Sequence, residues 1–225
     1  MDRLTPCRGA SIARRGVRQC VWLVVAAVML WLSRVDAQQL LDRVVARVSG
    51  VPITLTDVRI ATALGVIDAQ PNEDPQTSAA RQLIDRELEL TEVTRFPPQE
   101  PSAADIDKQV AAYKARVGNQ LAALMQSTGL TEERLRQMAR STVRIQAYLA
   151  QRFGTASVVP AAEVRRYYEA HPSEFMRDGR VLPFDDVEPI ARDAASSARR
   201  RGAIAQWLRD LRGRTDVFEP VVLQP

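Results

Sequence analysis

Apolar residues recur at helical spacing along most of the chain. Between Ser102 and Gly129 they are separated by four, three, four, four and three residues, the period of an amphipathic helix. Ser102 is a typical N-terminal cap and Gly129 suits a C-terminal end. The same pattern predicts further helices after Thr54 through Leu64 and over 76–95, 131–153, 160–170 and 184–212. In the last helix the positions expected to face inward are Val187, Ile190, Ala194, Ala198, Ile204, Leu208 and Leu211.

Short segments near both ends have the character of strands instead. LDRVVARV, residues 41–48, alternates, Ser-Gly at 49–50 makes a turn, and VPI at 51–53 leaves it. A terminal strand is predicted over 217–223. MRDGRVLP, residues 176–183, contains an Asp-Gly turn dipeptide between two predicted helices. The chain is therefore predicted to be mainly α, with a few short β-strands formed after its leader and at its C-terminus.

The first 37 residues have the order of a secretory signal. An arginine-rich start precedes an unbroken apolar run of 12 residues, Val21–Leu32, and VDA at 35–37 fits a cleavage site. The run is shorter than the ~20 apolar residues that span a bilayer. We therefore expect cleavage after Ala37, a periplasmic location and no integral membrane anchor in the mature chain. An anchor that is not cleaved is the alternative.

Charge and cysteine content narrow the function once the leader is set aside. The chain has 31 basic and 27 acidic residues, but the leader holds six arginines against two acids, which leaves 25 of each sign. A neutral exported protein is not expected to bind nucleic acid. Both cysteines, Cys7 and Cys20, lie in the leader, and His171 is the only histidine. Disulfides, a metal site and a bound cofactor are therefore not expected.

The sequence contains none of the common catalytic motifs, so no catalytic residue is assigned. Asp185 and Asp186 start a predicted helix, where acids favour the helix dipole. His171 lies between a predicted helix and a proline, which is typical of a helix end; a role in proton transfer is the alternative. The arginines at 199–201 indicate a solvated face, with contact to anionic lipid or an acidic substrate as the alternative.

Four residues on the central predicted helices are candidates for binding polypeptide. These are Tyr113, Met125, Met138 and Tyr148. Such residues commonly fill a core, but flexible methionines also suit surfaces that accept many partners. We therefore predict a peptide-binding role for them, with core packing as the alternative.

An ordered series of segments resembles the SurA-type, parvulin-associated chaperones of the bacterial periplasm. The segments are RVVARVSGVPITLTDVRIA, RQLIDRELELTEV, ADIDKQVAAYKAR, GLTEERLRQMARSTVRIQAYLAQRF, EVRRYYEAHPSEF and the PFDDVEPI…WLRDLR tail. In that family a parvulin isomerase domain separates the last two pieces. Here the gap is the eight residues 176–183, whereas a domain needs at least ~50 residues.

The resemblance implies a chaperone core without the isomerase domain. Residues 38–225 would form one SurA-N-like domain, in which 158–225 complete a helical part over 38–157. The last helix and strand would close onto the first strands and helices. The implied function is a non-enzymatic, ATP-independent holdase for unfolded polypeptides such as outer-membrane protein precursors.

Two other functions and one assembly stay open at the level of sequence. The chain could be an adaptor that binds one folded envelope partner, or it could retain prolyl isomerase activity. A homodimer formed by helix exchange is also compatible with the pattern, because the first and last segments must meet across the whole chain.

Overall fold

A computed structural model describes residues 42–68, 74–154 and 158–219. All of these residues belong to one compact unit, 42–225. The predicted export signal, its cleavage after Ala37 and the alternative of a retained anchor all lie outside the described residues.

Three short strands form a sheet from both ends of the described chain. β1 (Val44–Val48) and β2 (Val51–Thr54) are an antiparallel hairpin. Both turn residues, Ser49 and Gly50, have positive φ, as tight two-residue hairpins require. β5 (Val217–Phe218) pairs antiparallel with the other edge of β1, so the order is β2-β1-β5. The C-terminal strand therefore closes onto the first hairpin as expected, although residues 220–223 of the predicted strand lie outside the described part.

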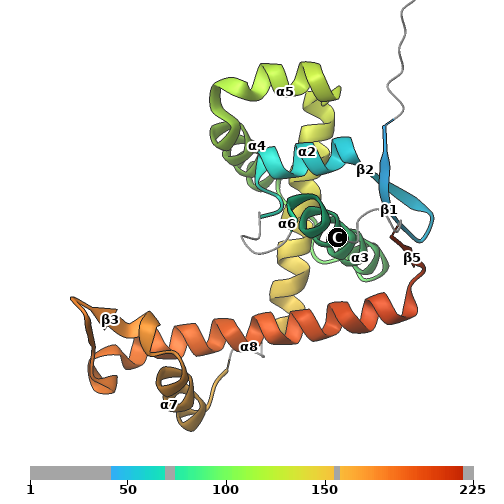
Figure 1. The fold of residues 1–225 in the computed structure, drawn as a ribbon. Coiled ribbons are helices and arrows are strands. Elements are labelled where there is room, and N and C mark those ends of the chain that lie inside the picture. Colours follow the sequence, from blue (N-terminus) through green and yellow to red (C-terminus); the bar gives the residue numbers. More distant parts are fainter. Residues whose placement is uncertain (1–41, 69–73, 155–157, 220–225) are drawn as a thin grey trace, which may run out of the picture. The chain divides into compact units, whose positions relative to one another are not determined.

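Helices make up most of the rest, and the predicted mainly α fold is confirmed (Figure 1). The helices are α2 (Leu55–Leu64), α3 (Pro75–Arg95), α4 (Ala103–Val117), α5 (Leu121–Thr128), α6 (Glu132–Phe153), α7 (Ala161–Ala170) and α8 (Phe184–Arg214), with short 3-10 turns η1 (Gly118–Gln120) and η3 (Pro172–Phe175). The predicted cap at Ser102 is present, and two other helices begin in the same way. Thr54, Ser102 and Thr131 each accept a hydrogen bond from the backbone N–H three residues later.

The single helix predicted between Ser102 and Gly129 is wrong, because the chain breaks at Gly118. Gly118 has φ 60° and ψ −132°, a conformation open almost only to glycine. α4 therefore ends at Val117, and α5 follows after one 3-10 turn. The apolar spacing continues across the break, which is why periodicity alone did not reveal it.

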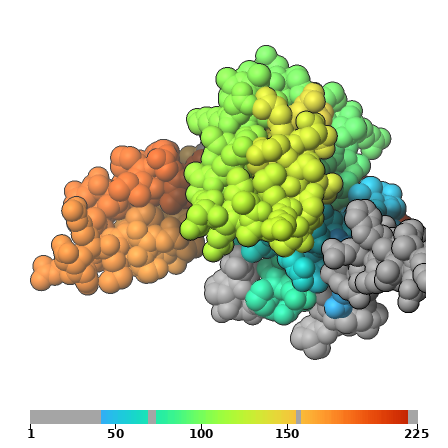
Figure 2. All heavy atoms as spheres, turned by 90° about the horizontal axis from the view of Figure 1, so that it is seen from above, coloured from blue at the N-terminus to red at the C-terminus, as the bar shows by residue number. Residues whose placement is uncertain are grey.

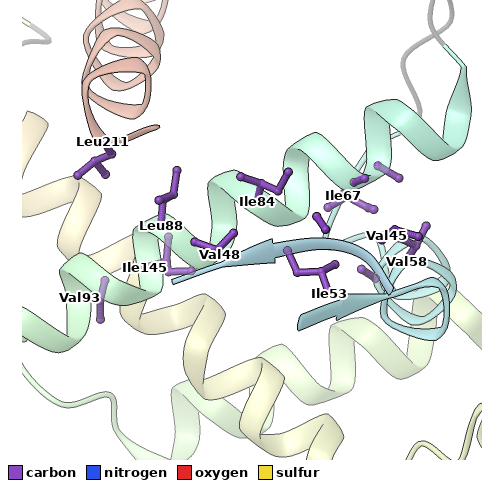
Figure 3. Close-up of a cluster of buried hydrophobic side chains, with 14 of the residues drawn as sticks. Val45, Val48, Ile53, Val58, Ile67, Ile84, Leu88, Val93, Ile145 and Leu211 are labelled. Atoms are coloured by element: carbon purple, nitrogen blue, oxygen red, sulfur yellow. The ribbon is translucent and has the colours of Figure 1, made fainter. Parts of the chain in front are cut away.

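The largest core lies between the hairpin and α3 (Figure 3). Val48 and Ile53 of the hairpin pack with Ile84 and Leu88 of α3, and Leu211 at the end of α8 belongs to the same cluster. A second core joins α2, α4 and α6 around buried Ile60, Leu64, Ile106, Tyr113, Leu130, Leu135 and Ala139. Figure 2 shows atoms of α4, α5 and α6, green to yellow, side by side on one face of the molecule.

A third, smaller core joins α7 to the first half of α8. It contains Val159, Val164, Phe175, Val187, Ala191 and Ala195. The predicted turn at 176–183 is a hairpin of β3 (Met176–Arg177) and β4 (Arg180–Val181), with positive φ at Asp178 and Gly179. The expectation that Ile190 faces inward is wrong, since its side chain is 61% exposed. The first half of α8 buries residues against α7, whereas Trp207 and Leu211 near its end are buried in the first core. The helix therefore has two separate buried faces.

Candidate functional site

A groove runs between the free edge of β2 and helices α2, α3 and α6. Its volume is about 190 Å³. Nine lining residues are apolar: Val51, Pro52, Ile53, Ile60, Ala61, Val66, Leu83, Leu90 and Met138. Four are charged: Asp57, Arg86, Glu87 and Arg134. The groove is thus mainly apolar and has a few charged side chains, which is the usual composition of a binding site.

One wall of the groove is an unpaired strand edge. Within the described residues, β2 pairs only with β1. Pro52 lies within β2 and has no N–H, so it cannot donate a hydrogen bond to an added strand. Thr54 uses its own N–H in a 3.0 Å bond to the Asp57 carboxylate. The edge therefore favours contact through side chains over recruitment of another strand.

An ion pair links α2 to α6 at the groove. The guanidinium of Arg134 lies 2.9 Å from the carboxylate of Asp57, which also closes the capping box with Thr54. Both side chains are partly exposed, so the pair contributes at most ~1 kcal/mol to stability. Its main effect is geometric, because it fixes the starts of two helices that line the groove.

Arg86 organises the floor of the groove. Its Nη2 donates to Thr142 Oγ1 at 2.7 Å and to the Met138 carbonyl at 3.3 Å. Thr142 Oγ1 also lies 2.6 Å from the Tyr113 hydroxyl. Burial lowers the pKa of the Arg86 guanidinium, and the negative charges nearby oppose that shift. This chain of polar groups ties α3, α6 and α4 together beneath the apolar lining.

Two carboxyl groups next to Arg86 are poorly solvated. Burial raises the pKa of Glu87, with Arg86 acting to lower it and Asp57 to raise it. Burial raises the pKa of Glu89 to about 7, again opposed by Arg86, while Asp85 adds to the rise. Glu87 lines the groove and Glu89 does not. A carboxyl whose pKa is raised to about 7 by burial is expected to make the stability of the fold depend on pH around neutrality.

The four predicted peptide-binding residues do not share one surface. Tyr113 is 4% exposed and belongs to the second core, where Met125 and Met138 are partly buried. Tyr148 is 5% exposed and packs in the first core against Trp207. Met138 alone among the four lines the groove, while Tyr148 lines a separate pocket at the ends of α3 and α6. The two tyrosines occupy core positions, which is the alternative considered for them.

The other singled-out residues have structural surroundings. His171 caps the end of α7, its ring stacks on Tyr167 at 4.1 Å, and its Nδ1 lies 2.9 Å from the Tyr167 carbonyl. Asp185 and Asp186 lie in the first turn of α8. Arg199 pairs with Glu163 of α7 at 2.9 Å. The positions of His171, Asp185 and Asp186 agree with the helix-end interpretation. Arg199 is partly exposed, but the Nε of Arg200 is buried, so a solvated face does not describe the whole run.

Sequence reasoning missed the most important residues of the groove. Arg86 lies between Ile84 and Leu88, two apolar residues that the sequence predicts to face inward. A charged residue at that place in the helix was the signal that could have identified it. The β2 edge residues were recognised only as a strand. Among residues 42–68, 74–154 and 158–219, no group of three or more His, Cys, Asp or Glu side chains could hold a metal ion. Over the same ranges, no helix is both long and apolar enough to cross a membrane.

Comparison with known proteins adds no relative to this picture. No family model matches the chain, and a search of curated proteins found no match either. The function must therefore be argued from the groove itself.

Proposed function

We propose that the chain is a non-enzymatic holdase of the periplasm, which binds unfolded or extended polypeptides such as outer-membrane protein precursors without ATP. The observation that carries this proposal is the apolar groove beside the β2 edge. Nine of its thirteen lining residues are apolar, so it can shelter apolar side chains that an unfolded chain exposes.

The size of the groove supports an extended segment as the ligand. About 190 Å³ is less than the ~300–1,000 Å³ of typical pockets for drug-sized molecules. The groove would hold one or two side chains at a time, with the rest of the segment on the surface. Such anchoring is weak and reversible, as a holdase with many clients requires.

Val51 and Val181 provide a matched pair for testing the groove. Val51 lines it and is 46% exposed, while Val181, 44% exposed on β4, lies outside it. Val51 is the first residue after the turn of its hairpin and Val181 the second after the turn of its own, and both are half-exposed, so glutamate should be tolerated at either position. Val51→Glu places a negative charge in the groove, and Val181→Glu is the control.

The assay is light scattering by an unfolded outer-membrane protein diluted from urea, without nucleotide. The mature chain should suppress aggregation at near-stoichiometric amounts. Val51→Glu should need several-fold more protein for the same effect, and Val181→Glu should match the parent. No suppression by the parent across a broad concentration range refutes holdase activity. Equal suppression by all three proteins places client binding elsewhere on the molecule.

The two other functions predict different results. An adaptor would capture a single folded partner from an envelope extract at fixed stoichiometry and would ignore unfolded chains. A prolyl isomerase would accelerate proline-limited refolding, and a loss of that acceleration in His171→Ala would identify the residue. We expect neither result.

A further inference from the structure

A second pocket lies where the C-terminal ends of α3 and α6 meet. Arg95, Phe96 and Pro97 line it from the end of α3. Tyr148, Gln151 and Arg152 line it from the last turns of α6. Its volume is about 570 Å³, within the range of small-ligand sites, and it shares no lining residue with the groove.

The lining is basic and contains no carboxylate. In the described part of the chain, neither Arg95 nor Arg152 forms an ion pair. The other four arginines of α6 each lie within 4.0 Å of a carboxylate: Arg134 of Asp57, Arg136 of Asp107, and both Arg140 and Arg144 of Glu100. Arg152 therefore departs from the pattern of its own helix.

The helix dipoles do not fully offset the two guanidinium groups. Each helix C-terminus carries the equivalent of about half a negative charge. Both α3 and α6 end at this pocket, in the turns that hold Arg95 and Arg152. Two positive side chains against two half charges leave about one positive charge uncompensated.

Aromatic groups fix Arg152 and supply a surface for stacking. Its guanidinium lies 5.3 Å from the ring centroid of Trp207 and 5.6 Å from that of Phe153. Its Nη1 is 3.4 Å from the hydroxyl of the buried Tyr148. Phe96 is 55% exposed, and the Arg95 guanidinium lies 5.4 Å from its ring. The pocket thus combines a held cation, a second cation and an accessible aromatic face.

We propose that this pocket binds an organic anion that carries an aromatic ring. The carboxylate accepts hydrogen bonds from Arg95 and Arg152, and the ring packs against Phe96 and Pro97. The same chemistry occurs in a free aromatic acid and in an acidic residue next to an aromatic one in a polypeptide. The proposal does not depend on the holdase function, because the two sites have separate linings.

Trp207 allows the site to be monitored directly. The other two tryptophans, Trp22 and Trp31, lie in the predicted leader, so a chain that starts at Gln38 has Trp207 as its only tryptophan. All three core clusters belong to the compact unit 42–225, which that chain contains. An anion at Arg152 should change the indole emission, because the guanidinium contacts the Trp207 ring.

The probe is 3-phenylpropanoate, with 3-phenylpropanamide and propanoate as neutral and ring-free comparisons. Calorimetry gives the affinity and Trp207 emission gives a second readout. We expect saturable binding of 3-phenylpropanoate. The amide should bind at least tenfold more weakly, because it loses the charge-assisted hydrogen bonds. Propanoate should also bind at least tenfold more weakly, because it loses the apolar contact of the ring with Phe96 and Pro97. Acetyl-Asp-Phe-amide serves as the polypeptide form. Tighter binding of this dipeptide than of the free acid assigns the site to polypeptide, and the reverse assigns it to a small molecule.

Variants locate the binding. Arg95→Gln and Arg152→Gln should each weaken binding of 3-phenylpropanoate at least tenfold. Arg152 contacts the Trp207 ring, whereas Arg95 stacks on Phe96, so Arg95→Gln is the variant that leaves the fluorophore contact in place. Arg166→Gln, an exposed change on α7 outside the pocket, should have no effect. Equal affinity for the acid and its amide overturns the proposal. So does unchanged affinity in Arg95→Gln, or the absence of saturable heat and emission change.

Discussion

Replacing Glu89 by glutamine should stabilise the fold above pH 7 and leave its stability almost unchanged at pH 4.5. Burial raises the pKa of this carboxyl from its ordinary value of 4.5 to about 7, although Arg86 acts in the opposite direction. Between these two values the folded protein holds a proton that the unfolded chain releases. Stability therefore falls as pH rises through this window, and the penalty is complete above pH 7. Glutamine has no charge to bury, so it removes the penalty.

The magnitude follows from the two pKa values. Their difference corresponds to an upper limit of ~3.4 kcal/mol, since each pKa unit is worth 1.36 kcal/mol. The attraction to Arg86 is already included in the folded pKa, and solvent reaches part of the side chain, so we expect ~1–2 kcal/mol at pH 8. Glu87 has a pKa raised by the same cause and is present in both proteins. The difference between parent and variant, not the slope of either, isolates Glu89.

The assay is urea unfolding followed by Trp207 emission at pH 4.5, 6 and 8, in a chain that starts at Gln38. The gain in unfolding free energy should be near zero at pH 4.5 and should grow with pH. Glu169→Gln, at an exposed position on α7, is the control and should show no gain that grows with pH. A gain that is the same at all three pH values, or a loss at pH 8, would refute the reasoning that burial of Glu89 is what costs stability.

Two further predictions concern the backbone. Gly118→Ala should destabilise the protein by ~1–3 kcal/mol, because φ 60° with ψ −132° is strained for any side chain, while Gly202→Ala inside α8 should stabilise it by ~0.5–1 kcal/mol. A Cβ meets nothing within 4 Å at either position, so urea midpoints that move in the same direction would contradict this contrast. Pro52→Ala restores an N–H to the unpaired β2 edge and should increase self-association, measured by light scattering at rising protein concentration. Scattering equal to the parent would show that Pro52 does not protect the edge.

Features set by neighbouring residues were accessible from the sequence. Helix starts at Thr54, Ser102 and Thr131 follow from a side chain that bonds a backbone N–H three residues later, a contact that needs no distant partner. The turns at 49–50 and 178–179 likewise follow from residues that tolerate positive φ. Such local signals were sufficient for the mainly α fold and for most helix starts, but they did not reveal the break at Gly118.

Features that depend on distant contacts were not accessible. Periodicity shows that a residue lies on an apolar face but not which neighbour covers that face, so Ile190 was expected inside although it is exposed. Tyr113 and Tyr148 were candidates for a binding surface, yet both are buried. Tyr113 of α4 is buried in the second core with residues of α2 and α6, and Tyr148 of α6 is buried in the first core with residues of α8. The groove is formed by residues of β2, α2, α3 and α6. One of them, Arg86, is hydrogen-bonded to Thr142, which lies 56 positions later in the sequence. No local pattern encodes that meeting.

The groove also depends on the far end of the chain. β2, which forms one wall, is held in the sheet by β1 alone. β1 is held on its other edge by β5 and on its buried face by α3, in a core that includes Trp207 and Leu211 of α8. Arg212 strengthens this closure, because its Nε lies 2.8 Å from Asp85 of α3 and its Nη2 donates to the Arg81 carbonyl at 2.9 Å. A wall built from residues 51–54 is thus stabilised by residues 207–218, so contacts between the two ends of the compact unit support the groove.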